Sequence, residues 1–194
     1  MSKAEDCIKA AIAMQEVLLE LGFDLADENF VGTPARFVKY LQEYLNGDQN
    51  PEKLLHTGFG RDCKYKGLIV QTNIPFRSCC PHHLLPVIGK AHLGYIPDKR
   101  VVGLSKLTRV VAAVGTEKPR LQEEITDILV DMLMGELGAS GAIVVISAEH
   151  GCMFGRGVAA NEVPTITSSV RGLLRTEAAA RAEFFQLVSL SHIK

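Results

Sequence analysis

The sequence predicts an α+β protein built on an antiparallel sheet, and three observations support this class. Segments with helical periodicity and segments with strand patterns come in runs, rather than alternating one by one along the chain. Apolar residues make up 47% of the chain and charged residues 22%, as in globular proteins with a packed core. A length of 194 residues suits one such domain with a helical extension and is too short for two full-sized domains.

Two helices are expected in the N-terminal part of the chain. Residues 3–21 carry apolar side chains at helical spacing, and Gly22 follows where a helix would end. Thr33 is a good N-cap residue and Pro34 suits the first helical position, so a second helix should open here and end near Gly47.

A connecting segment is expected to separate these helices from the main domain. Residues 46–66 are rich in glycine, aspartate and lysine and show weak periodicity. We therefore expect an N-terminal helical arm over residues 1–50 and a main domain over residues 51–194.

The main domain is expected to contain strands and helices in separate runs. Its expected strands are residues 67–73, 88–96, 101–104 (a short strand or a turn), 141–148 and 165–174. Its expected helices are residues 105–114, 121–137 and a closing helix that starts at residue 176. Residues 141–148 are continuous and rich in β-branched side chains, which predicts a strand buried on both faces.

Individual residues set the expected helix boundaries. Ser105 and Thr176 are expected to be N-caps, and the stretch 115–119 is expected to break the helix that Ser105 opens. The closing helix is expected to bury Phe184, Phe185 and Leu187.

The most reactive stretch is Ser78–Pro86, in which two thiols and two imidazoles occupy five consecutive positions. Thiolate sulfur and imidazole nitrogen are preferred zinc ligands, and the Cys-x-x-His spacing lets Cys80 and His83 reach one ion from a single turn. Cys152, just beyond an apolar strand, is the best candidate for a third ligand. Three protein ligands leave a fourth position for water, which is the pattern of a catalytic zinc site.

Two further cysteines could close the site as a fourth ligand. Cys79 is disfavoured because adjacent side chains in an extended segment point to opposite sides, and because Cys80 precedes a proline and so avoids the helical region. Cys63 remains an alternative. Iron or manganese in place of zinc also remains open.

Polar side chains near these clusters suit proton transfer and anion binding. Imidazoles titrate near neutrality, so His82 and His150 could pass protons beside a metal. A helix N-terminus with basic groups nearby is a site for phosphate. The candidates for that site are Ser105, Lys106, Arg109 and Arg156. From the residues alone, Gln122 and Glu123 suit a helix N-terminus, and Arg36 and Lys39 suit a solvated helix face.

Charge, hydropathy and cysteine content limit the class of protein. The net charge of −1 argues against nucleic-acid binding driven by bulk charge. The sequence contains no run of about 18 apolar residues and no secretory signal at its N-terminus, which argues against a membrane protein. Five cysteines, an odd number, favour metal binding or catalysis over disulfides. We expect a cytoplasmic protein.

Several motifs follow one another in a family-specific order. They are Thr33-Pro34-x-Arg36, Cys80-x-His82-His83-Leu84-Leu85-Pro86, Tyr95-Ile96-Pro97, Gly103-Leu104-Ser105-Lys106-Leu107-x-Arg109, Gln122-Glu123 and Glu149-His150-x-Cys152-Met153-x-x-Arg156-Gly157. In order and approximate spacing, from about residue 20 to the C-terminus, they resemble the GTP cyclohydrolase I family.

The resemblance implies a tunnelling fold, with helices on one side of the sheet and an N-terminal helical arm. Subunits of that fold join their sheets into barrels, here implied to be a homo-oligomer, a decamer of two pentamers with active sites at subunit boundaries. The implied reaction converts GTP to 7,8-dihydroneopterin triphosphate and formate, the first step towards folate or pterin cofactors.

The resemblance also implies a role for each matching residue. Cys80, His83 and Cys152 would hold Zn²⁺, whose bound water would attack guanine C8. His82 would protonate the ring nitrogen, and His150 would assist ring opening and the later ribose rearrangement. Glu123 would accept the guanine N1 and N2 hydrogens with Gln122 beside it. The implied triphosphate ligands are Ser105, Lys106, Arg109 and Arg156, together with Arg36 and Lys39.

Two departures from the family pattern leave alternatives open. Pro81 stands where the family usually has glutamate, and the chain between Arg109 and Gln122 is one residue longer than the common pattern. The alternatives are a related enzyme acting on dGTP or a 7-deazaguanine, the latter with a cysteine nucleophile and a nicotinamide cofactor, and a non-catalytic zinc- and nucleotide-binding assembly. Ring size, allosteric regulation and the downstream pathway remain open.

Overall fold

The computed structural model describes residues 3–47, 50–56, 58–59 and 64–191. The chain separates into two compact units, residues 1–46 and residues 47–194. None of the helices in the described ranges is long and apolar enough to span a membrane.

The smaller unit is a pair of helices, α1 (Lys3–Glu20) and α2 (Thr33–Tyr44). Gly22, at φ +84°, follows α1 in the left-handed conformation that a helix-terminating glycine adopts readily. The N-cap of α2 is Gly32 and not Thr33, which is already helical and makes no capping side-chain hydrogen bond. The prediction of a Thr33 cap is therefore wrong by one residue, while Pro34 does lie in the first turn.

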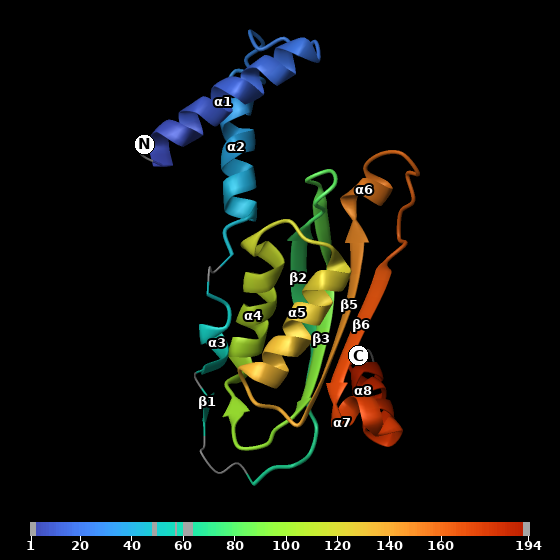
Figure 1. Ribbon diagram of the computed structural model, residues 1–194. Helices are drawn as coiled ribbons and strands as arrows, with labels where there is room; N and C mark the ends of the chain where they lie inside the picture. The colour runs from blue at the N-terminus through green and yellow to red at the C-terminus, as the bar shows by residue number, and fades with distance from the viewer. Residues whose placement is uncertain (1–2, 48–49, 57, 60–63, 192–194) are drawn as a thin grey trace. The chain divides into compact units, whose positions relative to one another are not determined.

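The larger unit is built on an antiparallel sheet (Figure 1). Its strands, in spatial order, are β2 (Ile69–Cys79), β3 (Pro86–Ile96), β5 (Gly141–His150) and β6 (Thr165–Gly172). Two short strands, β1 (Gly58–Phe59) and β4 (Val101–Val102), pair separately. The helices are α3 (Lys53–His56), α4 (Leu104–Glu117), α5 (Gln122–Gly135), α6 (Gly151–Phe154), α7 (Leu173–Thr176) and α8 (Ala178–Leu190). The predicted α+β class is confirmed.

Helices α4 and α5 cover one face of the sheet and enclose the main core (Figure 1). Alternate residues of β3, including Leu93 and Tyr95, point into this core. The central strand β5 is buried on both faces: Val144 packs in the main core, and Ile143 packs with Phe184 of α8 on the other side. Helices α4 and α5 lie together on one face of the sheet, as expected. Helix α8 packs on the opposite face.

Helix boundaries in the larger unit also differ from those expected. The N-cap of α4 is Gly103, which leaves Ser105 inside the first turn, and the N-cap of α8 is Glu177 rather than Thr176. Gly115 does not end α4, which continues to Glu117. A Cβ on Gly115 would lie 2.4 Å from the carbonyl oxygen of Arg77, so this glycine lets the helix approach β2 closely. Phe184 is buried as expected, but Phe185 is 46% exposed.

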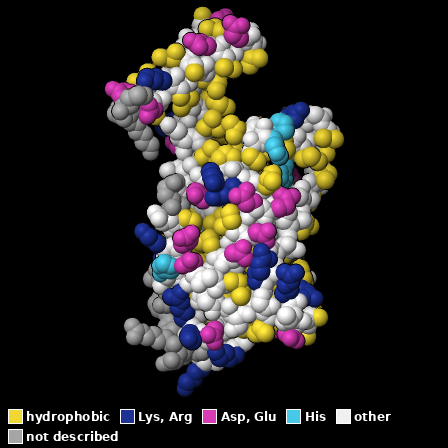
Figure 2. Space-filling view, in the orientation of Figure 1, with side chains coloured by type: hydrophobic (Ala, Val, Ile, Leu, Met, Phe, Trp, Pro, Cys, Tyr) yellow, Lys and Arg dark blue, Asp and Glu magenta, His cyan; other side chains and the backbone are white. Residues whose placement is uncertain are grey.

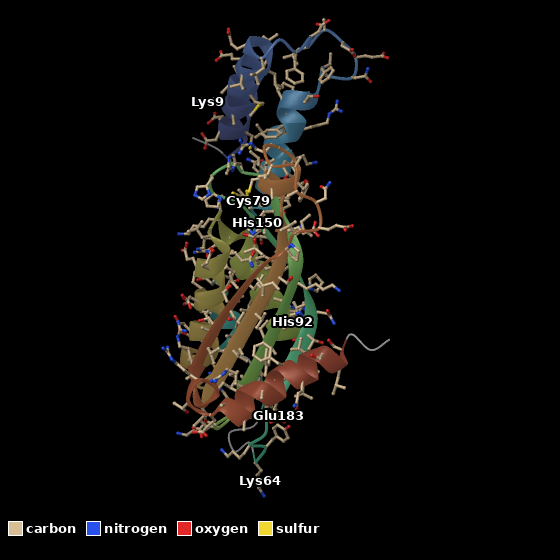
Figure 3. The ribbon with its side chains drawn as sticks, turned by 90° about the vertical axis from the view of Figure 1, so that its right-hand side faces the viewer. Lys9, Lys64, Cys79, His92, His150 and Glu183 are labelled. Carbon is tan, nitrogen blue, oxygen red and sulfur yellow. The ribbon has the colours of Figure 1, made fainter. Side chains whose placement is uncertain are left out.

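The strand registers fix which residues share an end of the sheet. Cys79 pairs with Pro86, and Val87 pairs with His150, so all four lie at one end. Figure 3 shows Cys79 and His150 near this end and His92 farther along the sheet. We call it the cysteine end. Tyr95 marks the opposite end, where its hydroxyl accepts a hydrogen bond from the backbone N–H of Val102 in β4.

Candidate metal centre and active site

A tight turn between β2 and β3 carries the first two candidate metal ligands. The backbone N–H of Leu84 donates to the carbonyl of Cys80 at 2.9 Å, and the N–H of Cys80 donates to the carbonyl of Leu85 at 2.9 Å. These bonds fold the chain back on itself, so that His83 Nδ1 lies 3.9 Å from Cys80 Sγ. The turn thus brings together the thiol and the imidazole of the Cys-x-x-His sequence.

Cys152 reaches the same place from a different element. It lies in α6, which begins directly after β5 at the cysteine end. Gly151 allows this approach because a Cβ there would lie 2.9 Å from the carbonyl oxygen of Pro86. One ligand atom each from Cys80, His83 and Cys152 lies within 4.8 Å of the others, with Cys80 buried and His83 exposed. We call these three residues the Cys-His-Cys cluster.

Cys79 and Cys63 were the two alternatives for a fourth metal ligand. In the described part of the chain, Cys79 does not belong to this cluster. Its thiol is 1% exposed, and burial, together with Cys80 beside it, raises the pKa of Cys79. Cys63 lies outside the described residues. Burial and the neighbouring Cys80 thiol also raise the pKa of Cys152, against an opposing effect of the Arg156 guanidinium.

Two exposed histidines form the outer face of the cluster. His82 Nδ1 lies 3.9 Å from Cys80 Sγ, and the rings of His82 and His83 are 6.3 Å apart. Figure 2 shows histidine side chains at the surface of the larger unit, next to apolar side chains. Arg156 donates a hydrogen bond from Nη1 to His83 Nε2 at 2.6 Å. A candidate phosphate ligand therefore contacts a candidate metal ligand.

His150 is held from the inner side by Gln122. Its Nε2 lies 2.9 Å from Gln122 Oε1, and burial lowers its pKa, against an opposing effect of the Glu123 carboxylate. Gln122 is only 3% exposed and its carboxamide is engaged with protein groups, whereas Glu123 beside it is exposed. The structure thus brings Glu123 to the cysteine end with a free path to solvent, and places the Gln122 side chain in the interior.

The structure does not bring the remaining larger-unit phosphate candidates to this end. Ser105 and Lys106 lie in the first turn of α4, which starts just after β4 at the Tyr95 end of the sheet. Arg109 follows one turn later. Strand β3 separates the two ends and spans 11 residues, about 33 Å at the usual rise per residue. These three residues cannot contact the same small molecule as their own chain's Cys-His-Cys cluster.

The last two candidates lie in the smaller unit. Arg36 and Lys39 are both on α2. The Arg36 guanidinium lies against Gly32, and the exposed Lys39 ammonium is 3.7 Å from the Glu43 carboxylate.

Sequence reasoning missed the polar contacts behind His150. Thr126 and Thr167 share a hydrogen bond of 2.6 Å beneath Gln122, on α5 and β6 respectively. Arg120, 10% exposed in its side chain, bridges Glu117 and Glu124 just before α5. Threonine in a strand and arginine before a helix are common, so only the fold shows that they share one site.

The chain is similar to known proteins over most of its length. The family model "GTP cyclohydrolase I" matches residues 10–189. The chain belongs to the GTP cyclohydrolase I family. It is 44% identical over 191 residues to GTP cyclohydrolase 1 of Halalkalibacterium halodurans, covering 97% of this chain and 99% of that one. It is 41% identical to the Clostridioides difficile protein of the same name, covering 92% and 94%, and 41% identical to that of Bacillus subtilis, covering 94% and 93%.

A solved structure adds a more distant likeness. The archaeosine synthase QueF-Like in its apo form is similar to 56% of this chain and 97% of that chain, with a TM-score of 0.47 and 16% identity. The family assignment expected from the motifs is confirmed by the family model and the curated relatives.

Proposed function

We propose that this GTP cyclohydrolase I family member opens the imidazole ring of GTP at C8, releases formate and forms 7,8-dihydroneopterin triphosphate. The observation that carries the proposal is the Cys-His-Cys cluster, whose ligand atoms lie within 4.8 Å of one another at the end of the sheet that also holds His150 and Glu123. A cluster of metal ligands beside two groups able to transfer or accept protons suits hydrolysis.

Zinc is the metal we propose for this cluster. Two sulfur donors and one nitrogen donor form a set that zinc prefers, and three ligands leave one position open. Cys80, His83 and Cys152 would hold it. When bound, zinc supplies Lewis-acid activation of the water that attacks C8.

The protein side chains would then divide the remaining work. We propose that His82, which is exposed beside the cluster, protonates the guanine ring nitrogen. His150 would move protons during ring opening and the ribose rearrangement. Burial keeps its imidazole neutral near neutral pH, as an acceptor of protons requires. The exposed Glu123 carboxylate would accept the N1 and N2 hydrogens of guanine, with Gln122 behind it.

We further propose that the site is completed by a second copy of the chain. Ser105, Lys106 and Arg109 lie at the Tyr95 end, so they would bind the triphosphate of a GTP held at a neighbour's cysteine end. Exposed apolar side chains on the sheet support association: Ile88 is 58% exposed and Ile166 is 66% exposed. The proposed assembly is a decamer of two pentamers, with Arg156, Arg36 and Lys39 also binding triphosphate.

The remaining proposals concern the whole chain. Residues 51–194 would form the catalytic domain and residues 1–50 the helical arm. Among the described residues, Cys7, Cys79, Cys80 and Cys152 form no disulfide, as is usual in the cytoplasm, which is the location we propose.

The test is product analysis with the purified, zinc-loaded protein. Incubation with GTP should release formate and yield a fluorescent pterin after oxidation. Both products should be lost in Cys152→Ala and kept in Cys7→Ala, a matched thiol substitution outside the cluster. Formate without pterin would show that the reaction stops after ring opening. Neither product, in protein that binds both zinc and GTP, would overturn the proposal, and dGTP is the next substrate to try.

A further inference from the structure

The Gln122 carboxamide has only one orientation that fits its surroundings. Its Nε2 lies 3.1 Å from the carbonyl oxygen of Ile146, 3.0 Å from that of Thr165 and 3.2 Å from Thr167 Oγ1. Carbonyl oxygens only accept hydrogen bonds, so the NH₂ group must face them. The carboxamide oxygen is therefore the atom that faces His150 Nε2, 2.9 Å away.

The hydroxyl groups beneath Gln122 agree with this orientation. Thr126 Oγ1 donates its single hydrogen to the backbone carbonyl of Gln122 at 2.7 Å. The hydrogen in the 2.6 Å contact between Thr126 and Thr167 must then come from Thr167. This leaves the Thr167 oxygen as an acceptor for the Gln122 NH₂ group. The two hydrogens of the NH₂ group are shared among these three acceptors, and the carboxamide oxygen is left to face His150.

The chain of assignments ends at the His150 imidazole. Because Gln122 Oε1 can only accept, His150 Nε2 must carry a hydrogen. A neutral imidazole has one N–H, so Nδ1 is left with its lone pair. We propose that Gln122 is a positioning residue, which holds His150 in its Nε2–H tautomer and makes Nδ1 the nitrogen that accepts a proton from the substrate. This inference rests on the proposed function of His150.

Burial gives this contact its strength. Gln122 is 3% exposed and lies on the first turn of α5, where the helix meets β5 and β6. A buried carboxamide with all its partners in place is held rigidly, because turning it would leave buried carbonyl groups unpaired. The backbone of two strands thus fixes the orientation of the imidazole through one side chain.

Two substitutions separate positioning from packing. Gln122→Met keeps the volume of the side chain and removes both donor and acceptor. Gln122→Glu keeps an oxygen that can accept from His150. A positioning role predicts that Gln122→Met lowers kcat for formate release by about tenfold or more and changes KM by less than about twofold, since oriented general acid–base groups contribute about 10²–10⁴-fold. It also predicts a higher kcat for Gln122→Glu than for Gln122→Met. A packing role predicts a lower kcat for Gln122→Glu than for Gln122→Met, because the glutamate adds a buried charge.

A spectroscopic readout tests the tautomer directly. Solid-state ¹⁵N NMR of the zinc-loaded, [¹⁵N]histidine-labelled protein, with the His150 signal assigned by its loss in His150→Gln, should show the Nε2–H tautomer. Gln122→Met should lose that tautomer and Gln122→Glu should keep it. Gln71→Met removes a carboxamide bonded to Thr108 elsewhere in the core and should leave the signal unchanged.

The inference and the proposed function fail in different ways. Wild-type protein without formate release would overturn the function, while its NMR spectrum would still test Gln122. An Nδ1–H tautomer at His150 of the wild type overturns the inference even if Gln122→Met does not fold. So does an unchanged His150 tautomer in a folded Gln122→Met variant.

Discussion

Arg156 and His83 are joined by a hydrogen bond of 2.6 Å from the guanidinium to Nε2 of the imidazole. Because Nε2 accepts, the single hydrogen of the neutral ring is on Nδ1, the nitrogen 3.9 Å from Cys80 Sγ. The guanidinium thus fixes the orientation of the imidazole that the Cys-x-x-His turn brings to Cys80.

Replacing Arg156 should separate metal binding from substrate binding. In Arg156→Met, zinc affinity should change little, because the three residues of the Cys-His-Cys cluster are all kept. KM for GTP should rise, since one triphosphate ligand is lost. Zinc affinity can be measured by competition with a chelator and KM by formate release. Weaker zinc binding would show instead that Arg156 supports the metal-bound ring.

Removing a thiol of the cluster should abolish metal binding. Cys80→Ser and Cys152→Ser should each lower zinc affinity by more than about 100-fold, which is the upper end for loss of an outer-shell partner. Bound zinc per chain, measured by elemental analysis after dialysis, gives the readout. Cys7→Ser is the matched control and should retain wild-type zinc. Full zinc in either cluster variant would contradict the assigned ligands.

The surface ion pairs between α5 and β6 should make stability depend on pH. Hydrogen bonds from Ser169 and Arg171 lower the pKa of Asp127 in the folded protein. Its stabilising contribution is therefore present above the unfolded pKa of about 3.9 and is lost as pH falls through the lower folded value. Asp127→Asn should lower the free energy of unfolding by no more than about 1 kcal/mol at pH 7, as exposed pairs do.

Denaturant unfolding at pH 7 and at pH 3 checks this prediction. The difference between Asp127→Asn and wild type should shrink at the lower pH. Glu43→Gln breaks an exposed pair within one helix, 3.7 Å from Lys39, and should have a smaller effect at pH 7. A difference for Asp127→Asn that grows on acidification would contradict the assignment.

Two helical glycines should respond oppositely to alanine. Gly115→Ala places a Cβ 2.4 Å from the backbone carbonyl of Arg77 and should destabilise the fold by about 1–3 kcal/mol, since the backbone cannot yield cheaply. Gly135→Ala meets nothing within 4 Å and should stabilise α5 by about 0.5–1 kcal/mol, from helix propensity alone. Thermal and denaturant unfolding of both variants test the pair. Equal effects would refute the close approach of α4 to β2.

Local patterns predicted which two cysteines and which histidine the fold brings together in the Cys-His-Cys cluster. Cys80 and His83 were found because a three-residue spacing within one turn suits a metal, and Cys152 because it follows a strongly apolar strand. Ser105 and Thr176 were misplaced as caps because capping depends on backbone angles that neighbouring glycine and glutamate residues adopt instead. The side chains alone do not encode that choice.

Long-range contacts account for the larger differences. Gly115 looks like a helix breaker, but its role is set by Arg77, which is 38 positions away in the sequence, and only the packed structure shows this. Gln122 suits the start of a helix and is the first residue of α5. Its carboxamide, however, donates hydrogen bonds to backbone carbonyls of β5 and β6. Sequence periodicity predicts which face of a helix is buried, but it does not predict which residues one buried side chain contacts.

If neighbouring chains complete each site, as we propose, the separation of Ser105 and Lys106 from the Cys-His-Cys cluster should make turnover depend on protein concentration. Each chain carries two halves of a proposed site about 33 Å apart, so a diluted, dissociated chain should be folded but inert. Two inactive variants, Lys106→Met and Cys152→Ala, should restore formate release when refolded together, because about a quarter of the boundaries in a randomly mixed ring then join two intact halves. Such complementation would be a direct sign that neighbouring chains share each reaction.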